Sequence, residues 1–403
     1  MNTLTMQEIE KAAERLKGVL HKTALERSET FSKIAGCDVY LKYENLQKTG
    51  SFKIRGAYNK ISELVEQSNV SSVVASSAGN HAQGVAFAAS TLGIKSTIVM
   101  PKTTPIAKIK ATEDYGATVI LHGDSYDDAC DKAMEIQKES NAEFIHPFND
   151  FSVIAGQGTI GHEILEALPN VDVIFVPAGG GGLLAGTAFA LKSINPRIKV
   201  IGVQAEGASA IAQSFGKKKL VSLPAVNTIA DGIAVKTPGD ITQGIIDEYA
   251  DEVITVSDAE ISSAILTLLE RSKQIVEPAG AASLAAVLSG KVDVKGKRCV
   301  CILSGGNIDV SFVHRIIDIG LVARNRKLKF RTVMKDVPGS LEEFAKIMSD
   351  SYANIIMVQY DRMSADLDPH EVILHIACEV GDKKHGERVV KNLEKNGYKV
   401  IME

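Results

Sequence analysis

The feature that most constrains the fold is a regular alternation, starting near residue 70, between short β-branched runs and longer amphipathic segments. The first series predicts strands at 70–75, 96–100 and 117–121 and helices at 80–93, 106–116 and 126–140. A second series predicts strands at 171–177, 199–205, 251–257 and 297–304, with helices between them. Strands that alternate with helices form parallel sheets, so we expect a doubly wound α/β protein. Because Gly-rich turns follow strands of both series, we expect two lobes with a cleft between them.

The rhythm changes near residue 324, in the basic segment ARNRKLKF. Beyond it the pattern predicts a strand, a helix, two strands, a helix and a strand, at 327–335, 339–350, 353–361, 371–380, 382–396 and 397–402. This βαββαβ order is typical of a ferredoxin-like sandwich. We therefore expect one domain at 1–324, with a smaller lobe of about residues 50–150 inserted in the larger, and a second domain at 325–403.

Composition narrows the possible partners and the compartment. The net charge of −4 argues against nucleic acid or an anionic membrane as a partner, and no apolar run has the length of a membrane span. The first residues form an amphipathic helix pattern and not a secretion signal, so we expect a cytoplasmic protein. Of the five cysteines, Cys299 and Cys301 lie two apart in an expected strand, and we interpret them as buried apolar residues. Neither a disulfide framework nor a metal site is expected.

Four consecutive glycines, 179–182, lie between an apolar strand and a helix. Residues without a Cβ can turn successive amides inwards, and the start of a helix favours an anion. The alternative is a merely flexible turn, but the position after a buried strand favours a phosphate site. No G-x-G-x-x-G or Walker lysine accompanies the run, which disfavours a nucleotide.

Three further loops carry groups suited to chemistry. SSAGNH (76–81) follows an expected strand, so its backbone N–H groups suit a carboxylate, although Ser and Asn also cap helices and His81 alone is more typical of a helix start. In KTGSFKIRGA, Lys53 taken alone would be an ordinary solvated surface lysine, but it stands between apolar residues with Arg55 nearby. A desolvated lysine beside a cation has a lowered pKa and becomes nucleophilic. SGGN (304–307) ends a strand with the hydroxyl of Ser304 at the edge where ligands bind.

Together, KTGSFKIRGA, SSAGNHAQG, PAGGGGL and LSGGN resemble the fold-type II pyridoxal-phosphate family, and TIADGIAVKTPG narrows the resemblance to its threonine ammonia-lyases (threonine dehydratases). The resemblance covers about residues 5–322. It implies a two-lobed catalytic domain that holds pyridoxal 5'-phosphate, with Lys53 as the Schiff-base lysine and catalytic base. It further implies that Phe52 lies beside the cofactor, that Asn80 bonds the ring 3-oxygen, and that Ser304 bonds the pyridine nitrogen. The phosphate would be held by Gly179, Gly180, Gly181, Gly182 and Leu183, and the substrate carboxylate by Ser77, Ala78, Gly79 and Asn80.

The implied activity is β-elimination from L-threonine, and from L-serine, to 2-oxobutanoate or pyruvate and ammonia. A neutral Ser304 at the ring nitrogen, in place of an acid, suits a concerted loss of the Cα proton and the β-leaving group. After the substrate displaces Lys53, the free amine is the natural base for the Cα proton.

Two alternatives remain beside elimination by a lyase. Serine racemases of the same family carry a serine where this sequence has Ala78, and they bind a divalent cation through a Glu and an Asp. Here Glu206 matches the Glu but Ala212 replaces the Asp, so elimination without such a metal is favoured. The other alternative is an inactive, amino-acid-sensing protein of this fold, and the presence of Lys53, Asn80 and Ser304 argues against it.

The C-terminal segment at about 327–403, with DVPGSL and ANIIMV, resembles an ACT domain. That resemblance implies an allosteric amino-acid effector, isoleucine or valine, bound near Gly339, Asn354 and Ile355. It also implies pairing with other copies, in a homodimer or homotetramer that serves threonine catabolism or isoleucine biosynthesis. The alternative is that the module is only a dimerisation surface.

Overall fold

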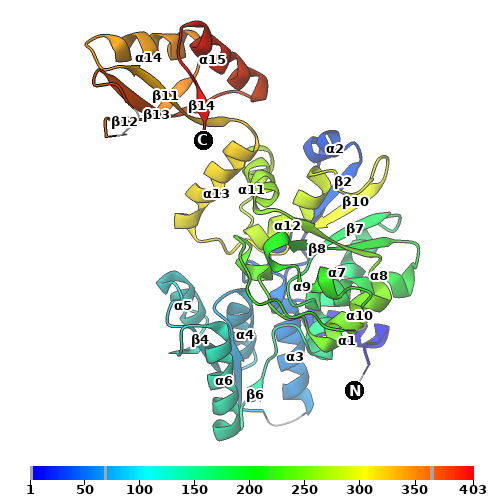
Figure 1. The fold of residues 1–403 in the computed structure, drawn as a ribbon. Helices are drawn as coiled ribbons and strands as arrows, with labels where there is room; N and C mark the ends of the chain where they lie inside the picture. Colours follow the sequence, from blue (N-terminus) through cyan, green and yellow to red (C-terminus); the bar gives the residue numbers. More distant parts are fainter. Residues whose placement is uncertain (1–2, 68–69, 218, 364–366) are drawn as a thin grey trace. The chain divides into compact units, whose positions relative to one another are not determined.

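The computed structural model describes residues 3–67, 70–217, 219–363 and 367–403 (Figure 1). The chain forms two compact units, Met1–Ser311 and Phe312–Glu403. Helix α13 (Val310–Ala323) falls almost wholly in the second unit, so the division between the units lies at the opposite end of this helix from the boundary expected at residue 324.

The larger sheet of the first unit has the strand order β1-β2-β10-β7-β8-β9. Its strands are β1 (Leu25–Arg27), β2 (Asp38–Lys42), β7 (Val173–Pro177), β8 (Lys199–Ala205), β9 (Glu252–Val256) and β10 (Arg298–Ile302). Only β1 runs antiparallel to its neighbour, and every residue of β7 is buried. A parallel strand that is covered on both faces requires a continuous apolar run, which VIFVP supplies.

The smaller sheet is wholly parallel, in the order β5-β4-β3-β6. Its strands are β3 (Ser72–Ser76), β4 (Lys95–Met100), β5 (Thr118–Leu121) and β6 (Glu143–Phe144). All four lie in the sequence between β2 and β7 of the larger sheet. The smaller sheet is therefore inserted in the sequence between β2 and β7 of the larger sheet, which β10 separates in space. Each sheet has its own apolar core.

The helices of the first unit connect and cover these strands (Figure 1). They are α1 (Met6–Leu16), α2 (Glu29–Ala35), α3 (Lys53–Gln67), α4 (Asn80–Thr91), α5 (Ile106–Glu113), α6 (Tyr126–Ser140), α7 (Phe151–Ala167), α8 (Gly182–Ile194), α9 (Ala210–Ser214), α10 (Asp240–Tyr249), α11 (Asp258–Thr267) and α12 (Pro278–Leu288). Short 3₁₀ turns are η1 (Glu44–Leu46), η2 (Glu206–Ala208) and η3 (Asp231–Ile233), and η4 (Leu268–Ser272) is a π-helical turn. The capping box expected at Ser257 and Glu260 is present at the start of α11.

The second unit contains an antiparallel sheet in the order β12-β13-β11-β14. Its elements after α13 are β11 (Lys327–Lys335), α14 (Ser340–Asp350), β12 (Asn354–Asp361), β13 (Glu371–Glu379), α15 (Lys383–Lys395) and β14 (Ile401–Met402). This confirms the predicted βαββαβ order. In β13 the alternating residues Val372, Leu374, Ile376 and Cys378 are all buried, as their spacing predicts.

Cys299 and Cys301 are fully buried and free in β10, which confirms their interpretation as apolar core residues. Burial is also the main reason why the pKa of the Cys299 thiol is raised. Among the described residues, no helix combines the length and the apolar character that crossing a membrane requires.

Candidate active site

Lys53 is the first residue of α3 and follows a loop that is attached to the end of β10. Ser51 forms an isolated antiparallel bridge with Gly305, and the backbone N–H of Phe52 donates to the carbonyl oxygen of Ser304 at 3.1 Å. These contacts bring together two loops that are far apart in the sequence. They place Lys53 at the carboxyl end of the larger sheet, where ligands bind in open α/β folds.

The Lys53 side chain keeps part of its surface accessible, although protein atoms surround its ammonium group. Its Nζ donates to the carbonyl oxygen of Pro147 at 3.0 Å and lies 5.4 Å from the centroid of the Phe52 ring. Burial lowers the pKa of Lys53 from 10.5 to about 8, and the charge of Glu277 partly opposes this shift. A lysine with this pKa is neutral often enough near physiological pH to act as a nucleophile.

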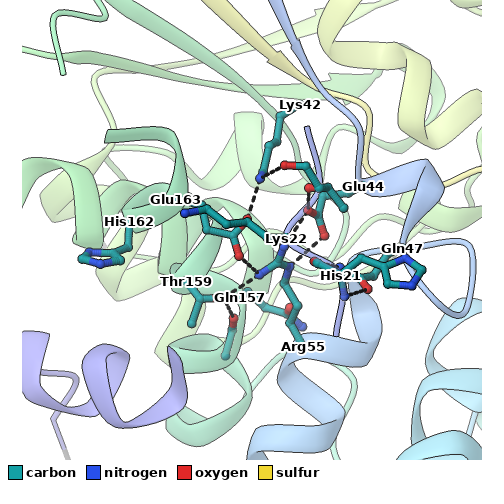
Figure 2. Close-up of polar contacts among 12 residues, drawn as sticks. His21, Lys22, Lys42, Glu44, Gln47, Arg55, Gln157, Thr159, His162 and Glu163 are labelled. Carbon is teal, nitrogen blue, oxygen red and sulfur yellow. Dashed lines mark hydrogen bonds and ion pairs between the residues drawn. The ribbon is translucent and has the colours of Figure 1, made fainter. Parts of the chain in front are cut away.

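Arg55 does not supply the cation that was expected to lower the Lys53 pKa. Figure 2 shows its guanidinium in a network with Glu44, Glu163 and Lys42. The distances are 2.8 Å from Arg55 Nε to Glu44 Oε2 and 2.6 Å from its NH1 to Glu163 Oε1. Although burial opposes the charged form, both carboxylates raise the Arg55 pKa above its ordinary value. The positive charge is thus neutralised inside the network, and burial is what lowers the pKa of Lys53.

Asn80 begins α4 and belongs to a chain of hydrogen-bonded side chains. Its Nδ2 donates to Glu277 Oε1 at 2.7 Å, and its Oδ1 accepts from Asn307 Nδ2 at 2.8 Å. The Asn307 Nδ2 also donates to the Thr49 carbonyl oxygen at 2.7 Å. Since each amide nitrogen carries two hydrogens, both hydrogens of Asn307 are used, whereas one N–H of Asn80 is left for a ligand.

The glycines at 179–182 follow β7 and lead into α8, whose second residue is Leu183. Gly181 has a φ of +96°, and a Cβ at Gly180 would overlap the ring of Phe148. The first amides of a helix have no carbonyl partner in that helix, and they favour an anion. The loop therefore forms a cradle that presents backbone N–H groups and has no room for side chains.

Ser304 lies two residues beyond the end of β10 and is 2% exposed. Its side chain is a neutral hydroxyl group and brings no charge to the end of the strand. Phe52, which is half-buried, stays next to it through the backbone hydrogen bond described above. Both residues thus lie where the loop of Lys53 meets the larger sheet.

Ser77, Ala78 and Gly79 form the turn between β3 and α4, immediately before Asn80. All three are half-buried, and the Gly79 N–H donates to the Ser77 hydroxyl oxygen at 3.2 Å. The turn therefore ends at the N-terminus of α4, which suits a carboxylate. The Gly79 amide is engaged by Ser77 in this arrangement.

Two histidines lie close enough to Lys53 for its charge to affect them. His81 is buried and its Nε2 lies 2.8 Å from the Ile145 carbonyl oxygen. Burial, followed by the charge of Lys53, lowers the pKa of His81 to about 3 and that of His146 to about 4. His146 Nδ1 accepts the backbone N–H of Asn149 at 2.8 Å, so Nε2 carries its proton. Both rings are neutral near pH 7, and His146 was missed because a single histidine in a loop has no distinguishing spacing.

Glu277 is a second site residue that the sequence did not reveal. It occupies the N-cap position of α12 without a capping side-chain hydrogen bond, and it is 5% exposed. Its backbone N–H donates to the Gly305 carbonyl oxygen at 3.0 Å. Burial raises the pKa of Glu277 to about 7, and the charge of Asp231 adds to the shift. In the sequence, a Glu before Pro278 is an ordinary helix-start pattern, so it does not mark a functional residue.

These residues fit pyridoxal 5'-phosphate. The glycine cradle suits its phosphate, Lys53 is nucleophilic, and Asn80 retains a free N–H. In addition, Ser51 Oγ and His81 Nδ1 are buried and have no hydrogen-bond partner within the described structure, as is expected of groups that await a ligand.

Glu206, which resembles a metal ligand of the racemases, pairs with a lysine. Lys291 Nζ lies 3.4 Å from Glu206 Oε1, 2.8 Å from Glu260 Oε2 and 3.0 Å from the Thr255 carbonyl oxygen. The described part of the chain contains no cluster of three or more His, Cys, Asp or Glu residues suited to a metal. In this structure the cation that pairs with Glu206 is the ammonium group of Lys291.

The chain belongs to the family of pyridoxal-phosphate dependent enzymes, whose model matches residues 16–305. It is 48% identical to the L-threonine ammonia-lyase of Thermotoga maritima over 98% of this chain and 99% of that protein. It is 47% identical to the catabolic L-threonine dehydratase of Escherichia coli K12, over 78% of this chain and 96% of that protein.

Solved structures give the same fold. A threonine deaminase isoform of Solanum lycopersicum is similar with a TM-score of 0.74 and 37% identity, over 80% of this chain and 91% of that one. A maize serine racemase is similar with a TM-score of 0.74 and 36% identity, over 79% of this chain and 98% of that one. The overall fold therefore does not separate elimination from racemisation, and local residues must do so.

Proposed function

We propose that this protein is an L-threonine ammonia-lyase, which converts L-threonine, and L-serine, to 2-oxobutanoate or pyruvate and ammonia. The observation that carries the proposal is the desolvated Lys53, with a pKa of about 8, in a site that also contains the glycine cradle. Similarity to a threonine ammonia-lyase along nearly the whole chain supports the choice of substrate.

Lys53 has two roles in this proposal. Its amine would hold the cofactor, and once the substrate has taken that place the neutral amine would accept the Cα proton. When bound, pyridoxal phosphate supplies an electron sink for that step. The amides of Gly179, Gly180, Gly181, Gly182 and Leu183 would hold the phosphate.

The other residues orient the cofactor and the substrate. Asn80 would donate its remaining N–H to the ring 3-oxygen, Ser304 would serve the pyridine nitrogen, and Phe52 would lie beside the ring. The turn of Ser77, Ala78, Gly79 and Asn80 binds the substrate carboxylate at the start of α4. For the Gly79 amide to take part, its hydrogen bond to Ser77 Oγ must open.

Elimination is favoured over racemisation because Ala78 has no proton to transfer to the second face of the substrate. Replacement of Ala78 by Ser should therefore raise the racemisation of L-serine from a near-zero level. Chiral analysis of the product measures the effect. Absence of D-serine would contradict either this alignment or the single-residue explanation.

For the second unit, we propose an ACT-type regulatory domain. Its ferredoxin-like strand order and exposed edge strand β12 support this proposal. Gly339, with a φ of +94°, precedes α14, while Asn354 and Ile355 begin β12. The Asn354 Nδ2 donates to Glu379 Oε2 at 3.1 Å, and this bond must yield if Asn354 is to hold isoleucine or valine.

We also propose that the protein acts as a homodimer or homotetramer in the cytoplasm. The exposed apolar side chains of β12, which include Ile356, Met357 and Val358, support association. Five free cysteines are in keeping with a reducing compartment.

Ammonia release tests the proposed activity. We expect release from L-threonine and L-serine and none from their D-isomers, in assays with and without isoleucine, valine or nucleotides. A yellow protein with no turnover of either L-amino acid would instead indicate an amino-acid sensor.

Calorimetry with isoleucine and valine tests the regulatory part. Truncation after residue 324 should leave activity but remove any effector response, since allosteric coupling requires a ligand site that favours one of two states, typically by about 1–3 kcal/mol. No binding heat, together with an unchanged threonine saturation curve, would leave only a structural role for the second unit.

A further inference from the structure

Glu277 is a buried carboxyl group that no role described above uses. Loops from separate parts of the chain surround it. An added Cβ at Gly305 would overlap its carboxyl group, and one at Gly232 would lie 3.3 Å from its Oε1. Asn80 Nδ2 donates to the same oxygen at 2.7 Å. Small residues therefore leave room for this carboxyl group against the amide of Asn80.

The charged groups that face Glu277 come from three elements. Asp231 of η3 opposes its ionisation, whereas Lys108 of α5 favours it, and these two residues pair with each other at 2.8 Å. Gly305, whose added Cβ would overlap the Glu277 carboxyl group, bridges Ser51, two residues before Lys53 of α3. At this site the charge of Glu277 raises the pKa of Lys53. Hydrogen bonds from Asn80 and from the backbone of Asn307 also favour the ionised form. The lysine and the carboxyl group are therefore electrostatically linked within one buried site.

We propose that Glu277 is a positioning residue of the catalytic site, whose carboxyl group orients the Asn80 amide and whose negative charge acts on the amine of Lys53. The first half rests on the proposed role of Asn80 toward the cofactor. The second half depends only on the protein itself.

The hydrogen-bond pattern explains the orienting effect. Glu277 Oε1 accepts one N–H of Asn80 while Asn307 donates to Asn80 Oδ1, so the amide plane is held from both sides. Only the second Asn80 N–H remains to meet a ligand. An amide held in this way loses little conformational freedom when it binds, and this favours a precisely placed ring.

The electrostatic effect follows from Coulomb's law in a low-dielectric site. An ionised Glu277 stabilises the ammonium form of Lys53, whereas a protonated or amidated side chain does not. Glu277 thereby limits how far burial can depress the pKa of Lys53. Because burial brings the Glu277 pKa itself to about 7, the charge state of this residue changes near neutral pH.

Amine labelling of the cofactor-free protein provides the test. We propose to measure the modification of Lys53 against pH by peptide mass spectrometry, in the native protein and in Glu277→Gln. Gln retains an acceptor oxygen for Asn80 but has no charge, so the labelling midpoint of Lys53 should move to lower pH. Glu260→Gln is the matched control, because it removes a carboxylate at another helix start and should leave the midpoint unchanged.

A second measurement separates the orienting effect from the charge effect. Glu277→Ala removes the acceptor and should weaken cofactor binding, followed by absorbance titration, more than Glu277→Gln does. An unchanged Lys53 midpoint in Glu277→Gln, or equal cofactor affinities in Gln and Ala, would overturn the corresponding half of the proposal. Neither result depends on turnover, so failure of the native protein to release ammonia from threonine would reject the proposed activity alone.

The pH dependence of the free energy of unfolding provides a measurement that does not involve labelling of Lys53. The pKa of Glu277 rises from 4.5 to about 7 on folding, so the folded protein binds more protons in this window and the free energy of unfolding falls as the pH rises. Glu277→Gln should lose this contribution, with a slope that differs by up to about one proton. Identical slopes in the native protein and Glu277→Gln would show that Glu277 does not titrate in this window. That result would contradict the proposed effect of its charge on Lys53.

Discussion

Two cationic residues on the first turn of α3, Lys53 and Arg55, have opposite surroundings. Arg55 is 1% exposed and contacts two carboxylates. Lys53 donates to a carbonyl oxygen, and no carboxylate among the described residues forms an ion pair with it. As a result the pKa of Arg55 is raised and that of Lys53 is lowered to about 8. Burial acts in the same direction on both, so the ion pairs determine the difference. A fully paired cation is locked in its charged form, whereas an unpaired one becomes reactive.

The network around Arg55 joins segments that position α3 (Figure 2). Lys42 of β2 lies 2.5 Å from Glu163 of α7, and Arg55 bonds both Glu163 and Glu44. Two cations therefore meet two anions, and the network carries no net charge. It can anchor the helix that begins with Lys53 without adding a positive charge to the active site.

The largest expected effect is on Lys53 itself. Lys53→Ala should abolish the covalent, borohydride-reducible attachment of the cofactor and lower threonine turnover by at least about 10³-fold, because nucleophile and base are lost together. Weak cofactor binding through the glycine cradle should remain. Lys60→Ala is the control on the same helix, since Lys60 pairs with Asp150 at 2.9 Å. A reducible attachment that persists in Lys53→Ala would reject the assignment.

Replacement of Arg55 should act on stability. Arg55→Met leaves Glu44 and part of the charge of Glu163 unpaired in the interior, so we expect a loss of about 3–5 kcal/mol in the free energy of unfolding. Urea denaturation measures it. Arg55→Lys, which restores the charge but not the forked geometry, should recover only part of the loss. Native stability in Arg55→Met would show that the network does not anchor α3.

The pH dependence of cofactor attachment sharpens the comparison. Only neutral Lys53 reacts, so the attachment rate to the cofactor-free protein should rise about tenfold per pH unit below its pKa of about 8 and level off above it. Stopped-flow absorbance follows the reaction. A rate that continues to rise up to pH 10 would mean that burial does not depress this lysine.

The smallest effect concerns Glu163. Glu163→Gln keeps an acceptor oxygen beside Arg55 and Lys42 but removes the anion that pairs with both cations. Because Glu44 still pairs with Arg55, we expect a loss of about 2 kcal/mol in the free energy of unfolding, less than in Arg55→Met. The pH midpoint of cofactor attachment should stay where it is in the native protein. If the midpoint moves, the Arg55 network does influence the charge at Lys53, and the two regions are not independent.

The sequence predicted most of the fold, because periodicity in long segments survives folding. The helix predicted at 126–140 is α6 with the same bounds, and the strand at 199–205 is β8. Short or irregular elements were predicted less well from the sequence. The strand predicted at 397–402 is formed only by Ile401–Met402, and the expected helix at 106–116 ends at Glu113. Strands β1 and β2 were not predicted, since short strands with polar residues have no strong pattern.

By itself the sequence determined the class of chemistry. A glycine run between a buried strand and a helix, and a lysine between apolar residues, are local patterns that predict an anion cradle and a nucleophilic amine. The burial that lowers the pKa of Lys53 is supplied by folding. Both motifs lie at the carboxyl ends of strands or at helix starts, as their positions in the α/β pattern predict.

Only the tertiary structure decided which charges meet. Arg55 stands two residues from Lys53 in the sequence, yet its charge is neutralised by Glu44 and Glu163. Glu277 is far from Lys53 along the chain, yet its charge acts on that lysine and its carboxyl group holds Asn80. Electrostatic interactions depend on distance in space and on burial, and folding sets both of these independently of sequence separation.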